Sequence, residues 1–173
     1  GKPETSNSLY DVTCDWLERT PIQGSVYGST NDEKNVDDFI ADYLLAHKKL
    51  YPDTNKDAVN FFEEESSLRR RRAGLVFIES YRELPLLAWP RKLISTLIEL
   101  EQSMILWRTS HARMVERMIG RRIGTGGSSG VDYLDMTTKY RVFVDLWAVR
   151  SILIKKEALP ELKNKVFYEF RGE

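Results

Sequence analysis

The sequence has 173 residues and a single cysteine, Cys14. One cysteine excludes a disulfide within the chain, and it makes a zinc or iron–sulfur site built from several thiolates implausible within one copy. A reducing, cytoplasmic setting therefore fits the composition best. The chain begins at Gly1 rather than at a methionine, so we expect a processed, tagged or excised product with residues missing upstream.

The chain also lacks an excess of either charge and lacks a long apolar run. Lys plus Arg and Asp plus Glu number 26 each, so no field of the whole chain attracts nucleic acid or anionic lipid. No stretch approaches the roughly 20 apolar residues of a membrane span, and the start GKPETSNSLY has neither region of a signal peptide. We expect no nucleic-acid partner and no membrane partner.

Apolar residues recur at helical spacing along most of the chain, which predicts an all-α fold. The run LVFIESYREL suits a helix or a strand, and we assign it as helix because no second strand-like run lies nearby to pair with it. We expect a single helical unit over residues 1–173, divided into a short helix 9–20, a loop 21–35, connecting helices 36–88, a long helix 89–120, a Gly/Ser loop 121–136, a C-terminal helix 137–154, and a tail 155–173 that leans on a partner or is loose.

The longest helical pattern follows Trp89 and Pro90. Pro90 suits the first turn and Gly120 suits the end of this helix. At about 1.5 Å per residue the helix would be roughly 45 Å long, more than a small domain needs for its own core. We therefore expect a central or interface helix whose inward face carries Leu93, Leu97, Leu100, Met104, Trp107, His111, Met114 and Met118.

Two charged features have a plain structural interpretation. His47 is followed by Lys48 and Lys49, so we expect a solvated side chain without a functional role. The segment FFEEESSLRRRR resembles a phosphate-binding arginine patch, but a short run of this kind is usually a solvated helix boundary.

His111 lies on the apolar stripe of the long helix, one turn after Trp107. An inward histidine is more often a core residue bonded to a carbonyl than a metal ligand. Zinc would need three or four protein ligands, whereas this chain has two histidines far apart in sequence. A heme needs one imidazole, because the porphyrin supplies four nitrogens. The core and the heme interpretations both remain open.

The segment GTGGSSG after the long helix has three interpretations. Its composition alone favours a flexible linker. A phosphate-binding loop is disfavoured, because the segment follows a helix and lacks the Gly-Lys-Ser/Thr ending. Its glycines can adopt positive φ, and Thr125, Ser128 and Ser129 supply hydroxyls, so the segment can also fold over a small polar ligand.

Taken together, these segments resemble tryptophan 2,3-dioxygenase, a heme-dependent family. The resemblance is strong over residues 91–154 and thinner elsewhere, and it rests on WRTSH, MVERMIG, GTGGSSG and KYRVFVDL, and more weakly on WLERTP near the start. It implies a helical bundle with one long central helix. It also implies oxidative opening of the indole ring of L-tryptophan by O2 to N-formylkynurenine, in a homotetramer.

The resemblance also implies roles for individual residues. His111 would be the axial ligand of the iron of heme b, with Trp107 near the proximal face of the heme. Arg108 would hold a propionate or a neighbouring helix. Thr125 would contact the amino-acid head of the substrate, and the rest of the loop would close over the site, including Gly124, Gly126 and Ser128.

The distal half of the family's site has no counterpart in this sequence, including the arginine that would pair with the substrate carboxylate. We therefore expect the C-terminal portion of the enzyme, catalytically poor without an upstream segment or a second chain. Two alternatives remain open. One is a non-catalytic module that binds heme or an indole-like ligand. The other is a related heme oxygenase for another aromatic amino acid or indole derivative, with Val131 altering the pocket.

Overall fold

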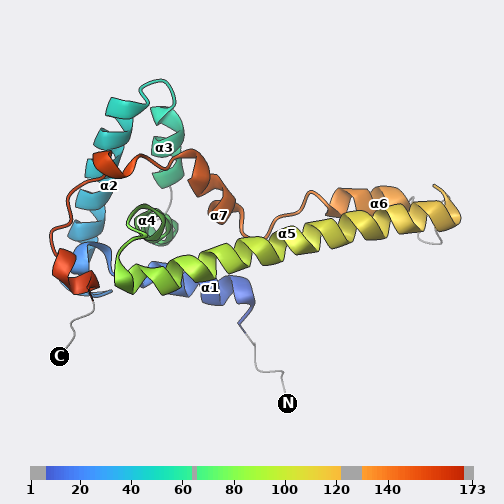
Figure 1. Cartoon of the computed structure of the whole chain (residues 1–173), viewed down its shortest axis with the longest axis horizontal. Helices are drawn as coiled ribbons and strands as arrows, with labels where there is room; N and C mark the ends of the chain where they lie inside the picture. Colours follow the sequence, from blue (N-terminus) through green and yellow to red (C-terminus); the bar gives the residue numbers. More distant parts are fainter. Residues whose placement is uncertain (1–6, 64–65, 122–129, 170–173) are drawn as a thin grey trace, which may run out of the picture. The chain divides into compact units, whose positions relative to one another are not determined.

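The computed structural model describes residues 7–63, 66–121 and 130–169 (Figure 1). Within these ranges every regular element is a helix, which confirms the all-α prediction. The α-helices are α1 Leu9–Glu18, α2 Asp32–Leu50, α3 Asn55–Phe62, α4 Ser66–Ser80, α5 Pro85–Ile119, α6 Gly130–Thr137 and α7 Val144–Ala148. Short 3-10 turns lie at η1 Ile22–Gly24, η2 Val149–Ser151, η3 Lys156–Ala158 and η4 Lys165–Tyr168.

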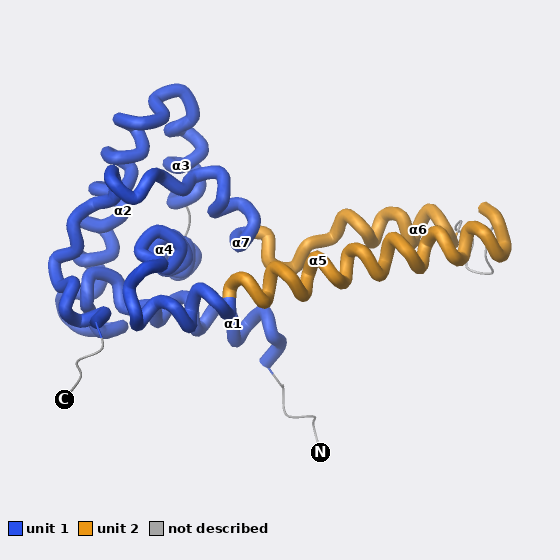
Figure 2. Tube along the Cα trace, in the orientation of Figure 1, with its two compact units in different colours: residues 1–93, 145–173 blue, residues 94–144 orange. Residues whose placement is uncertain are grey.

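The sequence predicts one helical unit over residues 1–173, whereas the internal contacts of the chain divide it into two units (Figure 2). Unit 1 comprises Gly1–Leu93 and Asp145–Glu173, and unit 2 comprises Ile94–Val144. Helix α5 contributes residues to both units. Among the described helices, none combines the length and the apolar character that crossing a lipid bilayer requires.

Unit 1 is built around a cluster of buried aromatic rings. The ring of Phe77 on α4 lies 5.3 Å from that of Phe39 on α2 and 5.4 Å from that of Tyr168 in η4. The hydroxyl of Tyr168 donates to the carbonyl of Pro21 and accepts from the amide of Gly24 at 2.8 Å. The expectation of a loose or partner-bound tail is therefore wrong for this part of the chain, because Tyr168 anchors the tail in the core of its own unit.

The two polar features that the sequence placed in solvent are partly buried in the structure. His47 is 1% exposed, and its Nδ1 lies 3.3 Å from Oδ1 of Asn55. Arg70 and Arg72 extend from α4 to Asp32 and Asp145, at 3.1 and 2.9 Å. Sequence neighbours suggested solvation, but α3 covers the histidine, and acids far along the chain pair with the arginines.

The helix boundaries also differ from those expected. The long helix is confirmed, but it begins at Pro85 rather than near Pro90, which lies inside it. It ends as predicted, since Gly120 follows in the left-handed region at φ 64°. The single helix expected over 137–154 is wrong: α6 precedes it, a non-helical stretch follows, and α7 and η2 form separately.

Close packing of α1 on α4 requires glycine at position 74. A Cβ built on Gly74 would lie 2.4 Å from the carbonyl oxygen of Leu17 and 2.9 Å from Oγ1 of Thr20. Since a backbone atom blocks the space, Gly74→Ala is expected to lower the free energy of unfolding by about 3 kcal/mol. Urea denaturation measures this, with Gly130→Ala as control because no atom of the described residues lies within 4 Å of its added Cβ. Equal losses in the two variants would contradict the packing argument.

Buried tyrosines make the stability of unit 1 sensitive to alkaline pH. Burial raises the pKa of Tyr43 to about 12, and it raises the pKa of Tyr81 and of Tyr168 as well. An unfolded tyrosine loses its proton near pH 10, so the stabilisation is complete below pH 10 and is lost as the pH rises from 10 towards 12.

We expect the free energy of unfolding to fall above pH 10 by about 1.4 kcal/mol per pH unit for each of these tyrosines. Urea denaturation between pH 8 and 11 measures the slope. Tyr43→Phe should make the slope shallower by the contribution of this one tyrosine hydroxyl. A slope that Tyr43→Phe leaves unchanged would show that this hydroxyl does not titrate with unfolding.

Candidate functional site

The candidate site lies in unit 2, where α6 runs beside the second half of α5. Among the residues of this unit that the structure describes, the buried side chains are Ile94, Leu97, Glu101, Ala112, Val131 and Phe143. Their spacing along α5 places them on the side that faces α6 and the chain after it. The Glu101 carboxylate accepts from the amides of Val142 and Phe143, at 3.0 Å for Phe143. These amides bind a side chain, so the helix expected there does not form.

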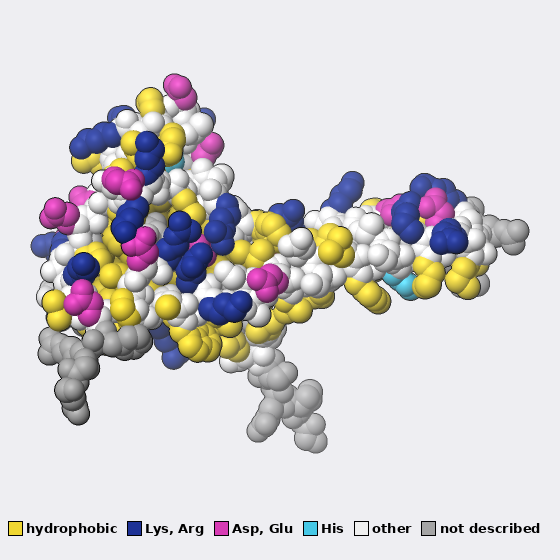
Figure 3. All heavy atoms as spheres, in the orientation of Figure 1, with side chains coloured by type: hydrophobic (Ala, Val, Ile, Leu, Met, Phe, Trp, Pro, Cys, Tyr) yellow, Lys and Arg dark blue, Asp and Glu magenta, His cyan; other side chains and the backbone are white. Residues whose placement is uncertain are grey.

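A second side of α5 is apolar and exposed, and we call it the apolar face. It consists of Leu100, Met104, Trp107, Met114 and Met118, whose exposed fractions lie between 42% and 76%. Figure 3 shows yellow apolar side chains gathered along one edge of this unit, with a cyan histidine among them. The apolar spacing of the sequence predicts that these residues face inward. In the described part of unit 2 they do not, because the buried residues lie on the side next to α6.

His111 lies on this apolar face with its side chain half-buried. Its imidazole stacks on the indole of Trp107, with ring centroids 5.4 Å apart and planes 5° from parallel. Within the described residues, no hydrogen bond engages either ring nitrogen of His111. Within this part of the chain, His111 is therefore not the core histidine bonded to a carbonyl that the simpler interpretation expects. The ring stacks on Trp107, and no described residue occupies its nitrogens.

Arg108 extends from α5 to the end of α6. Its Nη1 lies 3.3 Å from the carbonyl oxygen of Thr137 and 3.3 Å from that of Tyr140. Of the two roles expected for Arg108, the structure places the guanidinium at a neighbouring helix. A cation at this point also complements the negative end of the α6 dipole.

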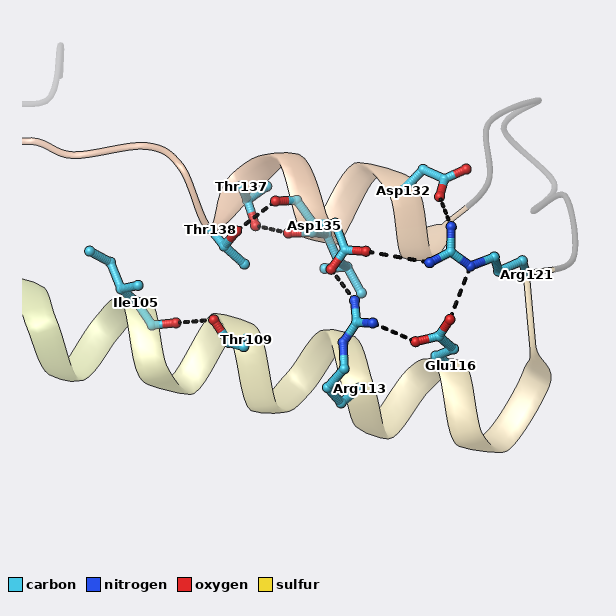
Figure 4. Close-up of polar contacts among 10 residues, drawn as sticks. Ile105, Thr109, Arg113, Glu116, Arg121, Asp132, Asp135, Thr137 and Thr138 are labelled. Atoms are coloured by element: carbon cyan, nitrogen blue, oxygen red, sulfur yellow. Dashed lines mark hydrogen bonds and ion pairs between the residues drawn. The ribbon is translucent and has the colours of Figure 1, made fainter.

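An ion cluster joins the start of α6 to the end of α5 (Figure 4). It consists of Arg113, Glu116, Arg121, Asp132 and Asp135. Arg113 bridges Glu116, at 2.6 Å, and Asp135. Arg121 contacts Glu116 and Asp132 at 3.0 Å each and Asp135 at 4.0 Å. The sequence does not predict this cluster, because its one local signal is the i,i+3 pair of Arg113 and Glu116 on α5.

The ion cluster raises the pKa values of its two arginines. A hydrogen bond to Asp135 raises the pKa of Arg113, and a hydrogen bond to Glu116 raises the pKa of Arg121. Both guanidinium groups therefore remain charged at any physiological pH. The substrate-side residues expected from the sequence, Gly124, Thr125, Gly126 and Ser128, lie outside the described residues.

Comparison with known proteins decides the family of this chain. The sequence model of the family tryptophan 2,3-dioxygenase matches residues 1–153. The chain belongs to the tryptophan 2,3-dioxygenase family. Family likeness therefore extends well beyond residues 91–154, where the sequence analysis found it strongest.

Three bacterial relatives show how much of a tryptophan 2,3-dioxygenase this chain represents. A tryptophan 2,3-dioxygenase-like protein of Xanthomonas campestris pv. campestris is 41% identical over 97% of this chain and 71% of the relative. Tryptophan 2,3-dioxygenase 2 of Ralstonia nicotianae is 43% identical over 96% of this chain and 53% of the relative. The tryptophan 2,3-dioxygenase of Sorangium cellulosum is 43% identical over 96% of this chain and 48% of the relative. The chain thus spans about half the length of two of these relatives.

Proposed function

We propose that this chain is part of a heme-dependent dioxygenase that uses O2 to open the indole ring of L-tryptophan, giving N-formylkynurenine. Membership of the tryptophan 2,3-dioxygenase family and the names of the relatives support the proposal. The structural observation that carries it is His111, an imidazole on an exposed apolar face whose nitrogens bind no other group among residues 7–63, 66–121 and 130–169. Because the chain spans about half of some relatives, the complete activity belongs to the assembled protein.

The donor chemistry around His111 fits heme b. Within the described residues, no three His, Cys, Asp or Glu side chains gather to hold a metal ion, so a metal bound here would take its remaining ligands from another group. A porphyrin supplies four nitrogens and needs one axial imidazole. Its faces are apolar, as are Trp107, Met104 and Met114 around His111. We propose His111 as the axial ligand and Trp107 as a neighbour of the heme.

Bound at His111, heme b would supply the iron that activates O2, and the protein would supply orientation and water exclusion. Stacking on Trp107 fixes the plane of the imidazole before any ligand arrives. The apolar side chains on the same face disfavour water near the reacting groups. Since Arg108 already contacts the end of α6, its contribution to a heme site is to hold that helix, unless a propionate displaces these contacts.

The substrate side of the proposal rests on Gly124, Thr125, Gly126 and Ser128. The Thr125 hydroxyl would hydrogen-bond the amino-acid head of L-tryptophan. Thr125→Ala is therefore expected to raise KM for tryptophan about five- to tenfold in the assembled enzyme, through loss of roughly 1 kcal/mol of binding. Steady-state kinetics measures this, with Ser129→Ala as the matched loss of a hydroxyl. An unchanged KM for Thr125→Ala would remove Thr125 from the substrate site.

The apolar face requires a covering partner, which we propose to be an upstream segment or further copies in a homotetramer. Contiguous apolar side chains of this size, five of them at least 42% exposed, are unusual on a protein that functions alone. Light scattering and mass spectrometry of the protein isolated under native conditions identify the partner. A cytoplasmic setting belongs to the proposal because Cys14 is the single cysteine.

Two measurements test the proposed function. Heme added to the purified protein should produce a Soret band, and reduction without air followed by O2 and L-tryptophan should produce the absorbance of N-formylkynurenine. A Soret band without product favours a second candidate, a helical module that binds heme or an indole-like ligand without turnover. The partial coverage of the relatives is the observation that favours this candidate. Absence of a Soret band would reject both for the isolated chain.

A further inference from the structure

Unit 1 contains a cavity of about 970 Å³ that shares no lining residue with unit 2. One wall is the end of α4 and the turn into α5, from Glu79 to Pro85. The opposite wall is the chain after η2, between Leu153 and Glu169. Sites for small molecules usually have volumes of roughly 300–1,000 Å³, so the cavity is suited to a small molecule rather than to a folded partner.

Buried tyrosines hold the second wall in place. The hydroxyl of Tyr43 donates to the carbonyl of Ile152 at 3.0 Å, just before this wall begins. The hydroxyl of Tyr81 donates to the carbonyl of Pro160 at 2.6 Å, in the middle of the wall. Tyr168, near its end, is buried in the aromatic core. The cavity is therefore formed by the fold itself and does not depend on a ligand to open it.

The lining of the cavity combines apolar side chains with an excess of acidic ones. The apolar residues are Leu84, Pro85, Leu153, Leu159 and Leu162. The acidic residues Glu79, Glu83, Glu161 and Glu169 outnumber the basic residues Arg82, Lys156 and Lys165. Lys156 contacts Glu83, and Lys165 lies 3.9 Å from Glu169, so two of the basic side chains have acidic partners in the cavity itself. This balance favours a ligand that has an apolar body and a positive charge.

The Glu79 carboxylate lacks partners for a buried charge. Its side chain is 0% exposed, and its Oε1 lies 3.3 Å from Nη2 of Arg150, whose side chain is 44% exposed. Its Oε2 is buried without a hydrogen-bond partner among the described residues. A carboxylate has acceptor sites for about four hydrogen bonds, and burial of a charge is costly unless these are filled. Glu79 is thus a buried acceptor at the cavity wall that lacks a donor.

We propose that this cavity binds a small amine with an apolar body, whose ammonium group donates to Glu79. An ammonium carries three donors and a positive charge, so it supplies both things that the Oε2 atom lacks. The hydrocarbon part would pack against Leu84 and Leu159. An anion would instead place a second negative charge beside Glu79. The inference goes beyond the proposed function, and neither depends on the other.

Calorimetric titration of the full chain with three probes of equal carbon number tests the proposal. Hexylamine carries a positive charge at neutral pH, hexanol is neutral, and hexanoate is negative. Hexylamine should bind about tenfold more tightly than hexanol, because a hydrogen bond to a charged group is stronger than one between neutral groups. Hexanoate should bind more weakly than either. Equal affinity for hexylamine and hexanol, or tighter binding of hexanoate, would overturn the proposal.

Glu79→Gln tests which carboxylate recognises the amine. The substitution keeps the size of the side chain and removes its charge, so hexylamine should bind about tenfold more weakly, while the affinity for hexanol changes by less than about twofold. Glu83→Gln is the matched control, because Glu83 lines the same cavity but is 63% exposed and pairs with Lys156. It should change the affinity for hexylamine by less than about twofold. Equal losses in the two variants would remove the assigned role from Glu79.

Leu162→Trp tests the cavity without altering Glu79. The larger side chain, placed on the half-buried second wall, should fill the space and abolish binding of both hexylamine and hexanol. Circular dichroism and urea denaturation show whether the variant is folded. A folded Leu162→Trp variant that binds hexylamine with full affinity would place the amine elsewhere and overturn the proposal. This variant also keeps the test decisive if Glu79→Gln does not fold.

Discussion

Replacement of His111 by alanine is expected to weaken heme binding by about 100-fold or more, and to reduce or shift the Soret band of the purified protein. The physical reason is that this imidazole is the donor that the apolar face presents with its nitrogens unengaged among the described residues. Trp107, which stacks on it, has no nitrogen able to coordinate iron. Titration of the variant and of the unmodified protein with heme measures the difference.

The substitution should leave the fold intact, so loss of heme can be assigned to the ligand. Alanine has the highest helix propensity, and the His111 side chain is half-buried on the outside of α5 rather than packed in a core. Circular dichroism and urea denaturation should therefore be close to those of the unmodified protein. Ser110→Ala changes the adjacent exposed residue and should retain the Soret band. A variant without His111 that binds heme with full affinity would show that another group is the ligand.

The helices could be predicted from the sequence because their signals are local. Apolar spacing and Gly120, which follows α5 at a left-handed position, mark the long helix correctly. The start of α5 was missed by one turn because proline is tolerated inside this helix at Pro90. Local rules therefore determine which segments are helical better than they determine where a helix begins.

Features that depend on tertiary partners could not be predicted in the same way. His47 lies beside two lysines in sequence, yet Asn55 of the next helix provides its polar partner. The helix expected over 137–154 is interrupted because Glu101, about 40 residues earlier, takes two of its amides. Nothing near these residues in sequence indicates either contact. A burial assignment from sequence neighbours fails wherever the decisive group comes from another element.

The sequence names candidate residues for the site, whose roles stay predictions, but it does not indicate their environment. His111 and Trp107 were identified from their spacing and from family likeness, and the structure stacks them as i,i+4 neighbours. The exposure of the apolar face was not predicted, because apolar periodicity indicates that a face will be covered without saying by what. The ion cluster was also missed, since its members come from both sides of the Gly/Ser segment.

The arginine run of α4 yields the second large prediction. Arg70 and Asp32 form an ion pair at 3.1 Å with side chains 11% and 4% exposed. Asp32 also accepts from the Ser25 hydroxyl at 2.7 Å and from the Gly28 amide at 3.0 Å. Asp32→Ala is expected to lower the free energy of unfolding by about 3–5 kcal/mol, because it leaves a buried guanidinium without its counter-ion. Urea denaturation measures the loss.

The double variant at Asp32 and Arg70 separates the cost of leaving a buried charge unpaired from the loss of a simple attraction between two charges. If the cost comes from the unpaired cation, then Asp32→Ala/Arg70→Leu should be more stable than Asp32→Ala alone, because the second substitution removes the charge that the first one strands. An exposed pair provides the comparison: Asp15 and Arg19 are 64% and 68% exposed, so Asp15→Ala should cost less than about 1 kcal/mol. Additive losses at Asp32 and Arg70 would mean that the guanidinium finds water or another acceptor once Asp32 is gone.

The guanidinium of Arg70 already lacks some of its hydrogen bonds. Its Nε and Nη1 are buried without a hydrogen-bond partner within the described part of the chain, so the loss of Asp32 would remove one of its few remaining partners. The run that in sequence resembles a solvated boundary therefore contains a buried cation, Arg70, and removal of its counter-ion Asp32 should strongly destabilise unit 1.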